Sequence, residues 1–418
     1  MSNKRVVVTG IGLITPVGNT VDKFWESILE GRSGVRKLSC FDPSKFSSQV
    51  AAEVLDFDPS LYLGSKDVRK TDRFVQFAIA ASKHAVSDSR LDITKENENR
   101  VGVIIGSGIG GLHTIESEHE KYLIRGPEKG PNKISPFLIP MLIVNMGSGQ
   151  VSMHFKAKGP NTSVATACAT GNHAIGDAYR IIQRGEADVM IAGGSEAAIT
   201  KMGFGGFCAL RALSSSRNEN PSTASRPFDK DRDGFVIGEG AGVLILENLE
   251  HAKKRNANIY SEIVGYGMSA DAYHMTAPDP QGEGAVRCMR LAVYDAGLKP
   301  EDVDYINAHG TSTVYNDKIE TLAIKKVFGE YARKVAISST KSITGHLLGA
   351  SGGVEAIACV LAMRDNIVPP TINYETPDPE CDLDYTPNKA RKRDLDVVMT
   401  NSLGFGGHNA SLVLKKYK

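Results

Sequence analysis

Short runs of β-branched residues alternate with longer helical patterns along this chain, and that alternation limits its fold more than any other feature. Several of the runs are continuously apolar, which is typical of strands that helices bury on both faces. The sequence therefore predicts an α/β protein with helices packed on mostly buried sheets. The predicted strands are Arg5–Thr9, Val101–Gly106, Asp188–Ala192, Val243–Glu247, Val303–Asn307, Val335–Ser338, Val397–Asn401 and Ala410–Lys415. The predicted helices are Lys23–Glu30, Lys70–Ser87, Ala174–Arg184, Glu283–Ala296, Ile319–Phe328 and Gly353–Arg364.

The length of the chain and a faint internal repeat indicate two related halves. A chain of 418 residues is too long for one simple core. The passages that begin at Val101 and Val303 both run from a strand through a glycine loop into a helix, half a chain length apart. Such passages are common, so the repeat is weak support by itself. We predict an N-terminal half of residues 1–255 and a C-terminal half of residues 256–418, without a low-complexity linker between them.

Composition argues against several classes of protein. The 49 basic and 48 acidic side chains give a formal charge of +1, which disfavours a protein that coats nucleic acid. The six cysteines form no Cys-x-x-Cys pair, so neither a zinc ribbon nor a disulfide framework is indicated and a reduced compartment is favoured. No apolar run approaches the roughly 18 residues that span a bilayer, and no signal segment is recognised. We therefore expect a cytoplasmic protein without membrane insertion.

Cys168 stands in a run of small residues, Val164-Ala-Thr-Ala-Cys168-Ala-Thr-Gly, just before a predicted helix. A thiol at a strand-to-helix turn faces the positive end of the helix dipole, which favours the thiolate. Small neighbours also leave room for a bulky acyl thioester at the sulfur. This setting favours a nucleophile, although a small buried cysteine is the commoner role. That commoner role is assigned to Cys40, Cys208, Cys288, Cys359 and Cys381.

Two histidines lie in polar loops punctuated by glycine. One loop is Asn307-Ala-His309-Gly-Thr311-Ser-Thr313, and the other runs from Ser338 through Lys341-Ser-Ile-Thr-Gly-His346 to Glu355. A cysteine with two such imidazoles satisfies the requirements of acyl transfer by a nucleophile and its hydrogen-bonding partners. A Cys-His-His zinc site is the alternative, but the spacing matches no metal motif and Lys341 would repel a cation.

A fourth segment, Asn401-Ser-Leu-Gly404-Phe405-Gly406-Gly407-His408-Asn409, is a glycine-rich turn around one aromatic ring. Such a loop can hinge, and its backbone N–H groups can point at an oxyanion. A tight turn between the last two strands is the simpler interpretation, and the loop can serve as both. No glycine cluster in the chain matches a dinucleotide-binding fingerprint, so no nicotinamide cofactor is indicated.

Together these segments resemble the β-ketoacyl–acyl-carrier-protein synthases, specifically the elongating type II enzymes, over essentially the whole chain. The resemblance also includes Val6-Val-Val-Thr-Gly-Ile-Gly and Arg226-Pro-Phe-Asp-Lys-Asp-Arg-Asp-Gly-Phe-Val-Ile-Gly-Glu-Gly-Ala-Gly. It implies a thiolase-like fold in which two related α/β halves form a five-layered α/β/α/β/α core, usually in a homodimer. It further implies an acyltransferase without a cofactor. Its reaction is the decarboxylative Claisen condensation of malonyl-acyl-carrier protein with a cysteine-bound acyl chain in fatty-acid elongation.

The resemblance also assigns roles to individual residues. Cys168 is similar to the acyl-accepting nucleophile, His309 and His346 to the paired histidines, Lys341 to the lysine of the Lys-Ser-x-Thr-Gly-His motif, and Phe405 to the gatekeeper aromatic. Thr311 and Thr313 match the threonines that hold the pantetheine arm, and Glu320 matches a glutamate that neighbours the lysine. Asn307, Glu355, Asn401 and Ser402 match positions where some members bind a monovalent cation. Two residues depart from the pattern, His408 where threonine is usual and Val314 where proline is commoner.

The expected macromolecular partner is an acyl-carrier protein bearing phosphopantetheine, and such proteins are acidic. A near-neutral enzyme then needs a local basic surface. The densest cluster is Lys66-Asp-Val-Arg69-Lys70, where helical spacing would place the three cations on one face, with Arg211 as a weaker addition. A solvated helix face is the ordinary interpretation of such a cluster.

Two alternatives stay open at this point. A polyketide-type ketosynthase would carry the same Cys-His-His group, and a non-catalytic chain-length partner subunit would share the fold. A thiolase is disfavoured because no second cysteine has a glycine-rich setting, and a priming synthase would carry Cys-His-Asn. The sequence does not specify the length or saturation of the acyl chain.

Overall fold

Ten strands of the described chain form one continuous sheet that divides into two groups with the same topology. The computed structural model describes residues 4–95 and 97–418. In the N-terminal half the spatial order is β5 (Asn161–Thr162), β4 (Val101–Gly106), β6 (Val189–Glu196), β7 (Gly240–Asn248) and β1 (Val6–Ile14). In the C-terminal half it is β10 (Ala336–Ser338), β9 (Tyr305–Asn307), β13 (Val397–Gly404), β14 (His408–Lys416) and β8 (Ser261–Ala270). If the five strands of each half are numbered one to five in chain order, the spatial order in both halves is 3-2-4-5-1.

The pairing directions repeat as well as the order. In each half the first three strands of that spatial order are parallel and the remaining contacts are antiparallel. The two groups meet where β1 pairs with β8 over Val6–Val8 and Ser261–Ile263. Related halves with identical topology are what the faint repeat in the sequence predicted. Two small sheets lie outside this framework, β2 (Arg36–Lys37) with β3 (Val50–Ala51) and β11 (Ile367–Val368) with β12 (Arg391–Lys392).

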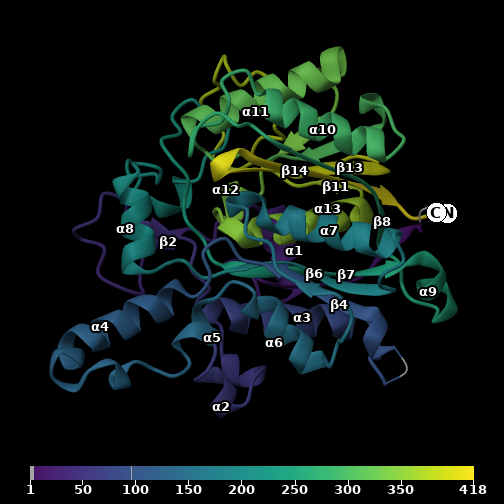
Figure 1. The fold of residues 1–418 in the computed structure, drawn as a ribbon. Coiled ribbons are helices and arrows are strands. Elements are labelled where there is room, and N and C mark those ends of the chain that lie inside the picture. The colour runs from purple at the N-terminus through teal and green to yellow at the C-terminus, as the bar shows by residue number, and fades with distance from the viewer. Residues whose placement is uncertain (1–3, 96) are drawn as a thin grey trace.

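Five layers follow from this arrangement, and Figure 1 shows them stacked from bottom to top. Outer helices cover one group of strands, two central helices lie between the groups, and further outer helices cover the second group. The predicted α/β/α/β/α core is thus confirmed. The outer helices are α3 (Arg73–Ser89) and α6 (Met146–Phe155) on one side and α10 (Glu283–Asp295) and α11 (Val314–Phe328) on the other. The central helices are α7 (Thr170–Gln183) and α13 (Ser351–Asp365).

The central position of α13 explains its composition. Every residue from Ser351 to Met363 is buried, so the helix is apolar or small on nearly all sides, with Glu355 as the one buried charged residue. A helix of this kind is stable only inside a protein or a membrane. No helix in the described part of the chain has both the length and the apolar character to cross a membrane.

All eight predicted strands overlap observed strands, but β8 was not predicted although it is ten residues long. Its glycines weakened the strand pattern. They are needed for close packing, since a Cβ on Gly265 or Gly267 would lie 2.1 Å from a carbonyl oxygen of α10. The equivalent strand β1 packs in the same way against α3, where a Cβ on Gly12 would lie 2.2 Å from the Ala81 oxygen.

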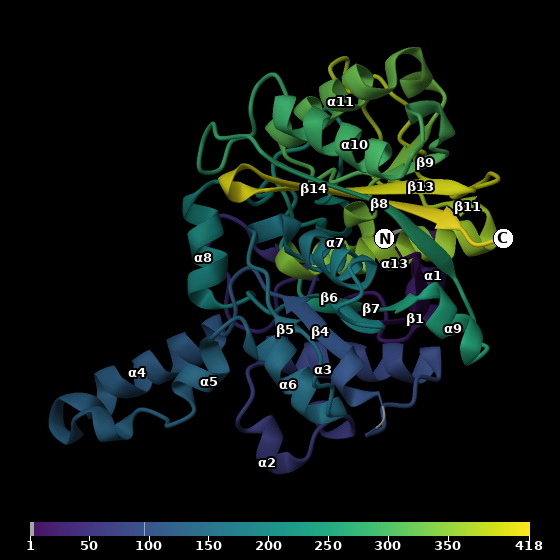
Figure 2. The ribbon, with the colours of Figure 1, turned by 45° about the vertical axis from the view of Figure 1, so that its right-hand side comes forward.

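The six predicted helices are also present, with shifted ends. The helix predicted from Lys70 begins at Arg73, because the side chain of Asp72 caps it by accepting the Phe74 N–H. Several helices were missed; α8, for example, contains three glycines that lower its helix propensity. Figure 2 shows α4 and α5 extending from the core as an arm. The predicted helix at Lys23 is α1 (Val21–Glu30), which begins two residues earlier. The additional helices are α2 (Ser65–Val68), α4 (Leu112–Lys129), α5 (Leu138–Leu142), α8 (Lys201–Ala209), α9 (Leu249–Lys254) and α12 (Lys341–Thr344).

The division at residues 255 and 256 stays a prediction. It falls between the end of α9 and the start of β8. The β1–β8 pairing and the central helix layer tie the two halves together at many points.

Candidate active site

A cavity of about 530 Å³ lies where loops from both halves meet, and it contains the three residues that the sequence singled out. Cys168, His309 and His346 all line it, and the Cys168 sulfur and the ligating ring nitrogens lie within 4.8 Å of one another. Each residue comes from a different turn, after β5, β9 and β10 respectively. The structure therefore brings together a nucleophile and two imidazoles that are distant in sequence.

Cys168 stands on a tight turn at the start of a central helix. The 3-10 turn η4 (Ala167–Ala169) leads directly into α7, and Ala167 has a φ of 49°. A left-handed backbone is costly for a residue other than glycine, about 1–3 kcal/mol, and such strain clusters at functional sites. The Thr166 N–H donates to the Thr170 hydroxyl at 2.8 Å, which closes the turn. The strained turn places a largely buried thiol at the wall of the cavity.

The Cys168 thiol rests protonated at neutral pH. Burial raises its pKa to about 11, while the Lys341 ammonium and the backbone N–H of Phe405 lower it and the Glu196 carboxylate raises it. Burial is the largest of these effects, and the contribution of the helix end stays a prediction.

His346 presents an N–H group to the cavity. Its Nδ1 accepts the backbone N–H of Leu348 at 3.1 Å and lies 2.9 Å from the Ser351 hydroxyl. An Nδ1 that accepts carries no proton, so the proton is assigned to Nε2. That Nε2 is buried and has no hydrogen-bond partner. Burial and the charge of Lys341 hold the pKa of His346 well below its usual value, so the ring is neutral.

His309 has the same tautomer for a different reason. The Lys341 ammonium lies 3.3 Å from its Nδ1, and because an ammonium can only donate, Nε2 again carries the proton. Burial, Lys341 and His346 all hold the pKa of His309 well below its usual value. The two rings stand almost perpendicular with centroids 5.3 Å apart. Two neutral imidazoles thus direct N–H donors toward the space beside Cys168. A metal ion bound by the same atoms would face the adjacent ammonium, which disfavours the zinc alternative.

Lys341 is held by a buried carboxylate. Its ammonium pairs with Glu355 of α13, and both side chains are nearly inaccessible to solvent. Burial raises the pKa of Glu355, and the charge of Lys341 opposes that rise. Removing either partner would leave an uncompensated buried charge, which typically costs about 3–5 kcal/mol.

Comparison with known proteins identifies the family. Residues 3–252 match the family described as beta-ketoacyl synthase, N-terminal domain, and residues 260–375 match beta-ketoacyl synthase, C-terminal domain. The chain belongs to the β-ketoacyl synthase family.

Full-length relatives agree with this assignment. The chain is 57% identical over 416 residues to the 3-oxoacyl-[acyl-carrier-protein] synthase 2 of Coxiella burnetii, covering 100% of this chain and 99% of the relative. It is 54% identical over 418 residues to the protein of the same name from Synechocystis, with the same coverage. Among solved structures, a type II PKS ketosynthase bound to the hexaketide, in complex with its acyl-carrier protein, superposes with a TM-score of 0.92 at 38% identity over 100% of both chains.

Phe405, the residue predicted to act as a gatekeeper, lies in the turn between the last two strands. Phe405 and Gly404 line the cavity, and Gly406 has a φ of 82° in the turn η9 (Phe405–Gly407). The Gly406 N–H donates to the Met275 carbonyl at 2.7 Å. The unusual His408 covers this glycine, because a Cβ on Gly406 would lie 3.0 Å from the imidazole ring.

Glu320 lies elsewhere than its expected position. It is fully buried on α11, it does not line the cavity, and its carboxylate accepts the N–H groups of His309 and Gly310, both at 2.8 Å. Burial raises its pKa to about 7. Glu355, and not Glu320, pairs with Lys341. Glu320 therefore supports the His309 loop from behind and has no contact with the space open to substrate.

The four residues expected around a monovalent cation are all buried, and Glu355 among them pairs with Lys341. Asn307 Oδ1, Glu355 Oε2 and Ser402 Oγ have no hydrogen-bond partner, whereas Asn401 Oδ1 accepts the Ser411 hydroxyl at 2.7 Å. Buried oxygens without partners call for an ion or an ordered water. These oxygens suit a hard cation, which would have to share the Glu355 carboxylate with the Lys341 ammonium.

The expected docking residues fall in two places. Lys66, Arg69 and Lys70 are exposed, but α2 ends at Val68, so only Lys66 of the three lies in a helix. Lys70 lies over the ring of Phe137, 5.0 Å from its centroid. Arg211 instead lines the cavity, just after α8. Figures 1 and 2 both show α2 far from α8.

Sequence analysis missed one buried carboxylate of the cavity, Glu196. It accepts the N–H groups of Gly108 at 2.8 Å, Ile109 at 3.1 Å and Gly349 at 3.0 Å, and the Ser107 hydroxyl at 2.8 Å. It thereby joins a loop of the N-terminal half to the loop that carries His346. A carboxylate at the end of an otherwise apolar strand run was the available signal.

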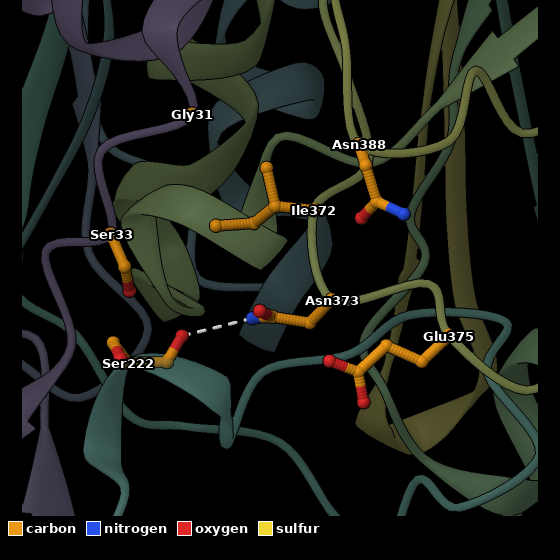
Figure 3. A pocket seen from close by; sticks show the side chains of 7 residues that line it. All are labelled: Gly31, Ser33, Ser222, Ile372, Asn373, Glu375 and Asn388. Atoms are coloured by element: carbon orange, nitrogen blue, oxygen red, sulfur yellow. Dashed lines mark hydrogen bonds between the residues drawn. The ribbon is translucent and has the colours of Figure 1, made fainter.

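A second cavity of about 320 Å³ is lined by none of the residues of this group (Figure 3). Its lining contains neither a cysteine nor a histidine, so it offers no comparable chemistry. The residues that line it are Gly31, Ser33, Ser222, Ile372, Asn373, Glu375 and Asn388.

Proposed function

We propose that this protein is a 3-oxoacyl-acyl-carrier-protein synthase that elongates fatty acyl chains on Cys168. The observation that carries the proposal is the convergence of two neutral, Nε2-protonated imidazoles on one buried cysteine within 4.8 Å. High identity to two proteins named 3-oxoacyl-[acyl-carrier-protein] synthase 2 supports the same reaction.

In the first half-reaction the acyl group moves from a pantetheine thioester to Cys168. The sulfur attacks the carbonyl carbon, the pantetheine thiolate leaves, and the proton of the Cys168 thiol ends on the departing sulfur. The transient oxyanion needs donors, and the backbone N–H groups of Cys168 and Phe405 are suited to supply them. The Phe405 N–H supports this role because it already acts on the sulfur.

In the second half-reaction a malonyl thioester loses CO₂ and leaves an enolate. The Nε2–H groups of His309 and His346 donate to the developing enolate oxygen, which is electrostatic stabilisation and not proton removal. The enolate carbon then attacks the Cys168 thioester, and the cysteine leaves as a thiolate that takes a proton. Acyl thioester, malonyl thioester and one proton thus yield a 3-oxoacyl thioester, a free carrier thiol and CO₂.

Two features favour this function over the alternatives. A non-catalytic chain-length subunit has no use for a cysteine on a strained turn between two such histidines. A polyketide ketosynthase is the closer alternative, yet the identity to the solved polyketide enzyme is 38%, against 57% to the Coxiella burnetii synthase. We therefore place the chain in fatty-acid elongation.

The proposed partners are acyl-carrier proteins that deliver acyl and malonyl thioesters. Thr311 and Thr313 line the cavity with their hydroxyl oxygens 2.9 Å apart, which suits hydrogen bonds to the amides of a pantetheine arm. Arg211 stands at the same cavity and can attract an acidic carrier, with Lys66, Arg69 and Lys70 as a second basic surface. We further propose a monovalent cation at the Asn307, Glu355, Asn401 and Ser402 oxygens and a cytoplasmic setting, which suits six free cysteines.

We also propose a homodimer formed through the outer edge of the N-terminal group of strands. Strand β5 is the last strand of the sheet on that side, and an exposed edge invites pairing. The α4–α5 arm nearby exposes Leu123, Ile124 and Ile139 to 60% or more. Sedimentation of the parent and a Leu123→Glu/Ile124→Glu variant tests this, since a monomeric parent would contradict it.

The decisive experiment is condensation with purified carrier protein charged with acyl chains of graded length. We expect acyl mass on the Cys168 peptide, a 3-oxoacyl product and one CO₂ per condensation. Acyl mass on Cys208 or Cys381 instead, or acylation without any condensation, would contradict the proposed function. The same series measures which chain length the cavity prefers.

A further inference from the structure

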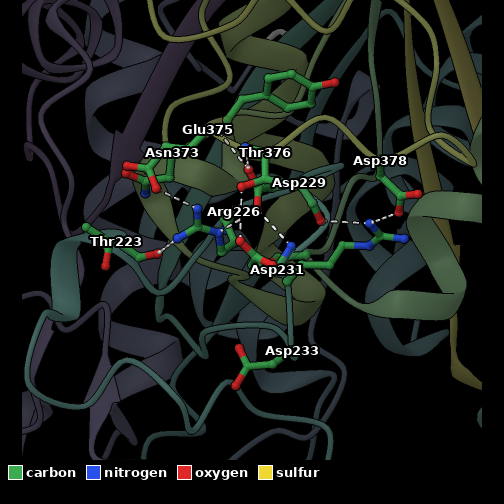
Figure 4. A network of polar contacts seen from close by, with 12 residues as sticks. Thr223, Arg226, Asp229, Asp231, Asp233, Asn373, Glu375, Thr376 and Asp378 are labelled. Atoms are coloured by element: carbon green, nitrogen blue, oxygen red, sulfur yellow. Dashed lines mark hydrogen bonds and ion pairs between the residues drawn. The ribbon is translucent and has the colours of Figure 1, made fainter.

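The run from Arg226 to Gly234, which is part of the family resemblance and supplies none of the catalytic group, buries two arginines. The side chains of Arg226 and Arg232 are 0% and 2% exposed, and both contact Asp229, which is itself fully buried. Figure 4 shows Arg226 and Asp229 at the centre of this network of polar contacts. A buried guanidinium is costly unless its donors are paired, so the partners of each arginine show what it holds in place.

Arg226 holds the side of the network that lies away from the catalytic group. Its side chain donates to Asp229 at 3.0 Å, to the Thr223 carbonyl at 3.4 Å and to Glu375 at 2.8 Å. Glu375 borders the second cavity, and none of these three residues lines the cavity of Cys168. The side chain of Arg226 therefore makes no hydrogen bond to a residue that lines the cavity of Cys168.

Arg232 holds the active-site wall directly. Its Nε donates to the Thr313 carbonyl and its Nη2 to the Val314 carbonyl, both at 3.1 Å. Its remaining nitrogen donates to the Asp229 carbonyl at 2.7 Å and to Asp378 at 2.5 Å. Thr313 and Val314 both line the cavity of Cys168. One guanidinium thus joins that wall to two segments behind it.

The wall needs such support because its backbone is strained. Ser312, between the two threonines, has a φ of 69°, a left-handed conformation that costs about 1–3 kcal/mol outside glycine. Its N–H donates to Asp317 at 3.1 Å, and Arg232 lies 3.7 Å from the same carboxylate. The kink is what sets Thr311 and Thr313 with their hydroxyls 2.9 Å apart. We expect that loss of the support would let the wall relax and separate these hydroxyls.

We propose that Arg232 is a positioning residue for the thioester arm, which it serves by holding the Thr311–Thr313 wall in its bound geometry. This inference rests on the proposed function, because it takes the arm to be the pantetheine of an acyl thioester. Arg232 has no contact with the reacting atoms, so it acts on binding of the arm and not on the chemistry at Cys168.

The test compares Arg232→Lys with Arg226→Lys. Lysine keeps the positive charge but replaces the planar guanidinium by a single ammonium group. The ammonium cannot reach both wall carbonyls and both acceptors on the far side, the Asp229 carbonyl and Asp378, at once. The two variants perturb the same buried network around Asp229, and only one of them loses contacts to the wall. The readout is the half-reaction that loads Cys168 from an acyl-pantetheine thioester, followed by mass spectrometry.

We expect Arg232→Lys to raise KM for the pantetheine thioester about tenfold, with kcat changed less, and Arg226→Lys to change KM less than about twofold. Alkylation of Cys168 by iodoacetamide, which has no arm, should proceed at the parent rate in both. Equal KM values in the two variants, or a parallel loss of alkylation, would overturn the inference.

If Arg232→Lys does not fold, Asp378→Asn supplies the second measurement. It keeps an acceptor oxygen but removes the negative charge that pairs with Arg232, so the guanidinium is held less firmly from behind. We expect a smaller rise in KM in the same direction, and an unchanged KM would count against the role. The proposed function is tested separately, by condensation and CO₂ release in the parent enzyme. If that test failed, the loading measurement could still be made and interpreted.

Discussion

The turns that precede the two central helices have the same backbone and opposite chemical roles. The turn η4 leads into α7, and the turn η8 (Leu348–Ala350) leads into α13. The first residue of each turn, Ala167 or Leu348, has a φ of 49°. The second residue is Cys168 in one turn and Gly349 in the other. One turn, present twice, therefore places the proposed nucleophile, Cys168, from one half and the proposed hydrogen-bond donor, His346, from the other.

The different second residues follow from what each turn faces. Cys168 faces the cavity, where its sulfur has room to react. Gly349 faces the joint between the halves, where a Cβ would lie 2.6 Å from the Gly108 nitrogen and 2.7 Å from Glu196 Oε2. The Gly349 N–H donates to the Glu196 carboxylate. This hydrogen bond fixes the turn whose neighbouring N–H, that of Leu348, donates to His346 Nδ1. The comparison shows that backbone geometry is repeated while the side chain at one position decides the role of each turn.

The largest effect is expected at the first turn, from Cys168→Ala. Alanine fits the turn but has no nucleophile, so acyl loading and condensation should fall at least about a thousandfold. Mass spectrometry of the loaded protein and a coupled product assay measure this. Thermal unfolding close to that of the parent serves as the control. Acyl mass that persists on another cysteine would break the assignment of chemistry to this turn.

The next effect is expected at the second turn, from His346→Ala. Loading of Cys168 should continue, while CO₂ release from the malonyl thioester falls about a hundredfold or more, because an enolate donor is lost. His309→Ala is the matched control and should show the same separation of the two steps. A variant that releases CO₂ at the parent rate would show that the second turn has no part in the chemistry.

The pH dependence of the first turn comes third. The thiolate is the reactive form, and the Cys168 pKa is raised to about 11, so the thiolate fraction should rise about tenfold per pH unit below that value. Alkylation by iodoacetamide should thus increase log-linearly from pH 7 to pH 9. A rate that levels off near neutral pH would mean that the helix end, after all, stabilises the thiolate.

A smaller effect is expected from Gly349→Ala. The added methyl group meets backbone at Gly108 and the Glu196 carboxylate, so we expect the free energy of unfolding to fall by about 1–3 kcal/mol. Urea denaturation measures it. Cys168→Ala is the matched control, because the same side chain then occupies the equivalent position of the other turn without this clash. Equal stability of the two variants would remove the proposed reason for glycine.

The smallest effect is expected from Ala167→Gly. Glycine adopts a φ of 49° without strain but also loosens the unfolded chain, so stability should change by less than about 1 kcal/mol. Leu348→Gly changes the same backbone angle and also removes a buried side chain, so it should destabilise by about 2 kcal/mol more. Urea denaturation measures the free energy of unfolding of both variants. An equal loss of stability in the two would contradict the expected difference.

Local patterns were sufficient for much of the fold. Apolar runs located the strands that carry the site loops, and the six long helices followed from periodicity. Strand β8 was not predicted because Gly265 and Gly267 weaken its strand pattern. Both glycines are required there because α10 packs too closely for a Cβ. Helix α3 begins later than predicted because the cap at Asp72 competes with helix propensity upstream. Such competition depends on contacts that no local window contains.

The sequence by itself determined the chemical groups of this protein, Cys168, His309, His346 and Lys341, because residue type and glycine-rich loops are local properties. Only the tertiary structure decided how those groups behave. Glu355 and not Glu320 faces Lys341, the backbone N–H of Leu348 fixes the tautomer of His346, and burial raises the Cys168 pKa. Each of these depends on which distant segments exclude water from a group or donate to it, and that is a property of the packed chain alone.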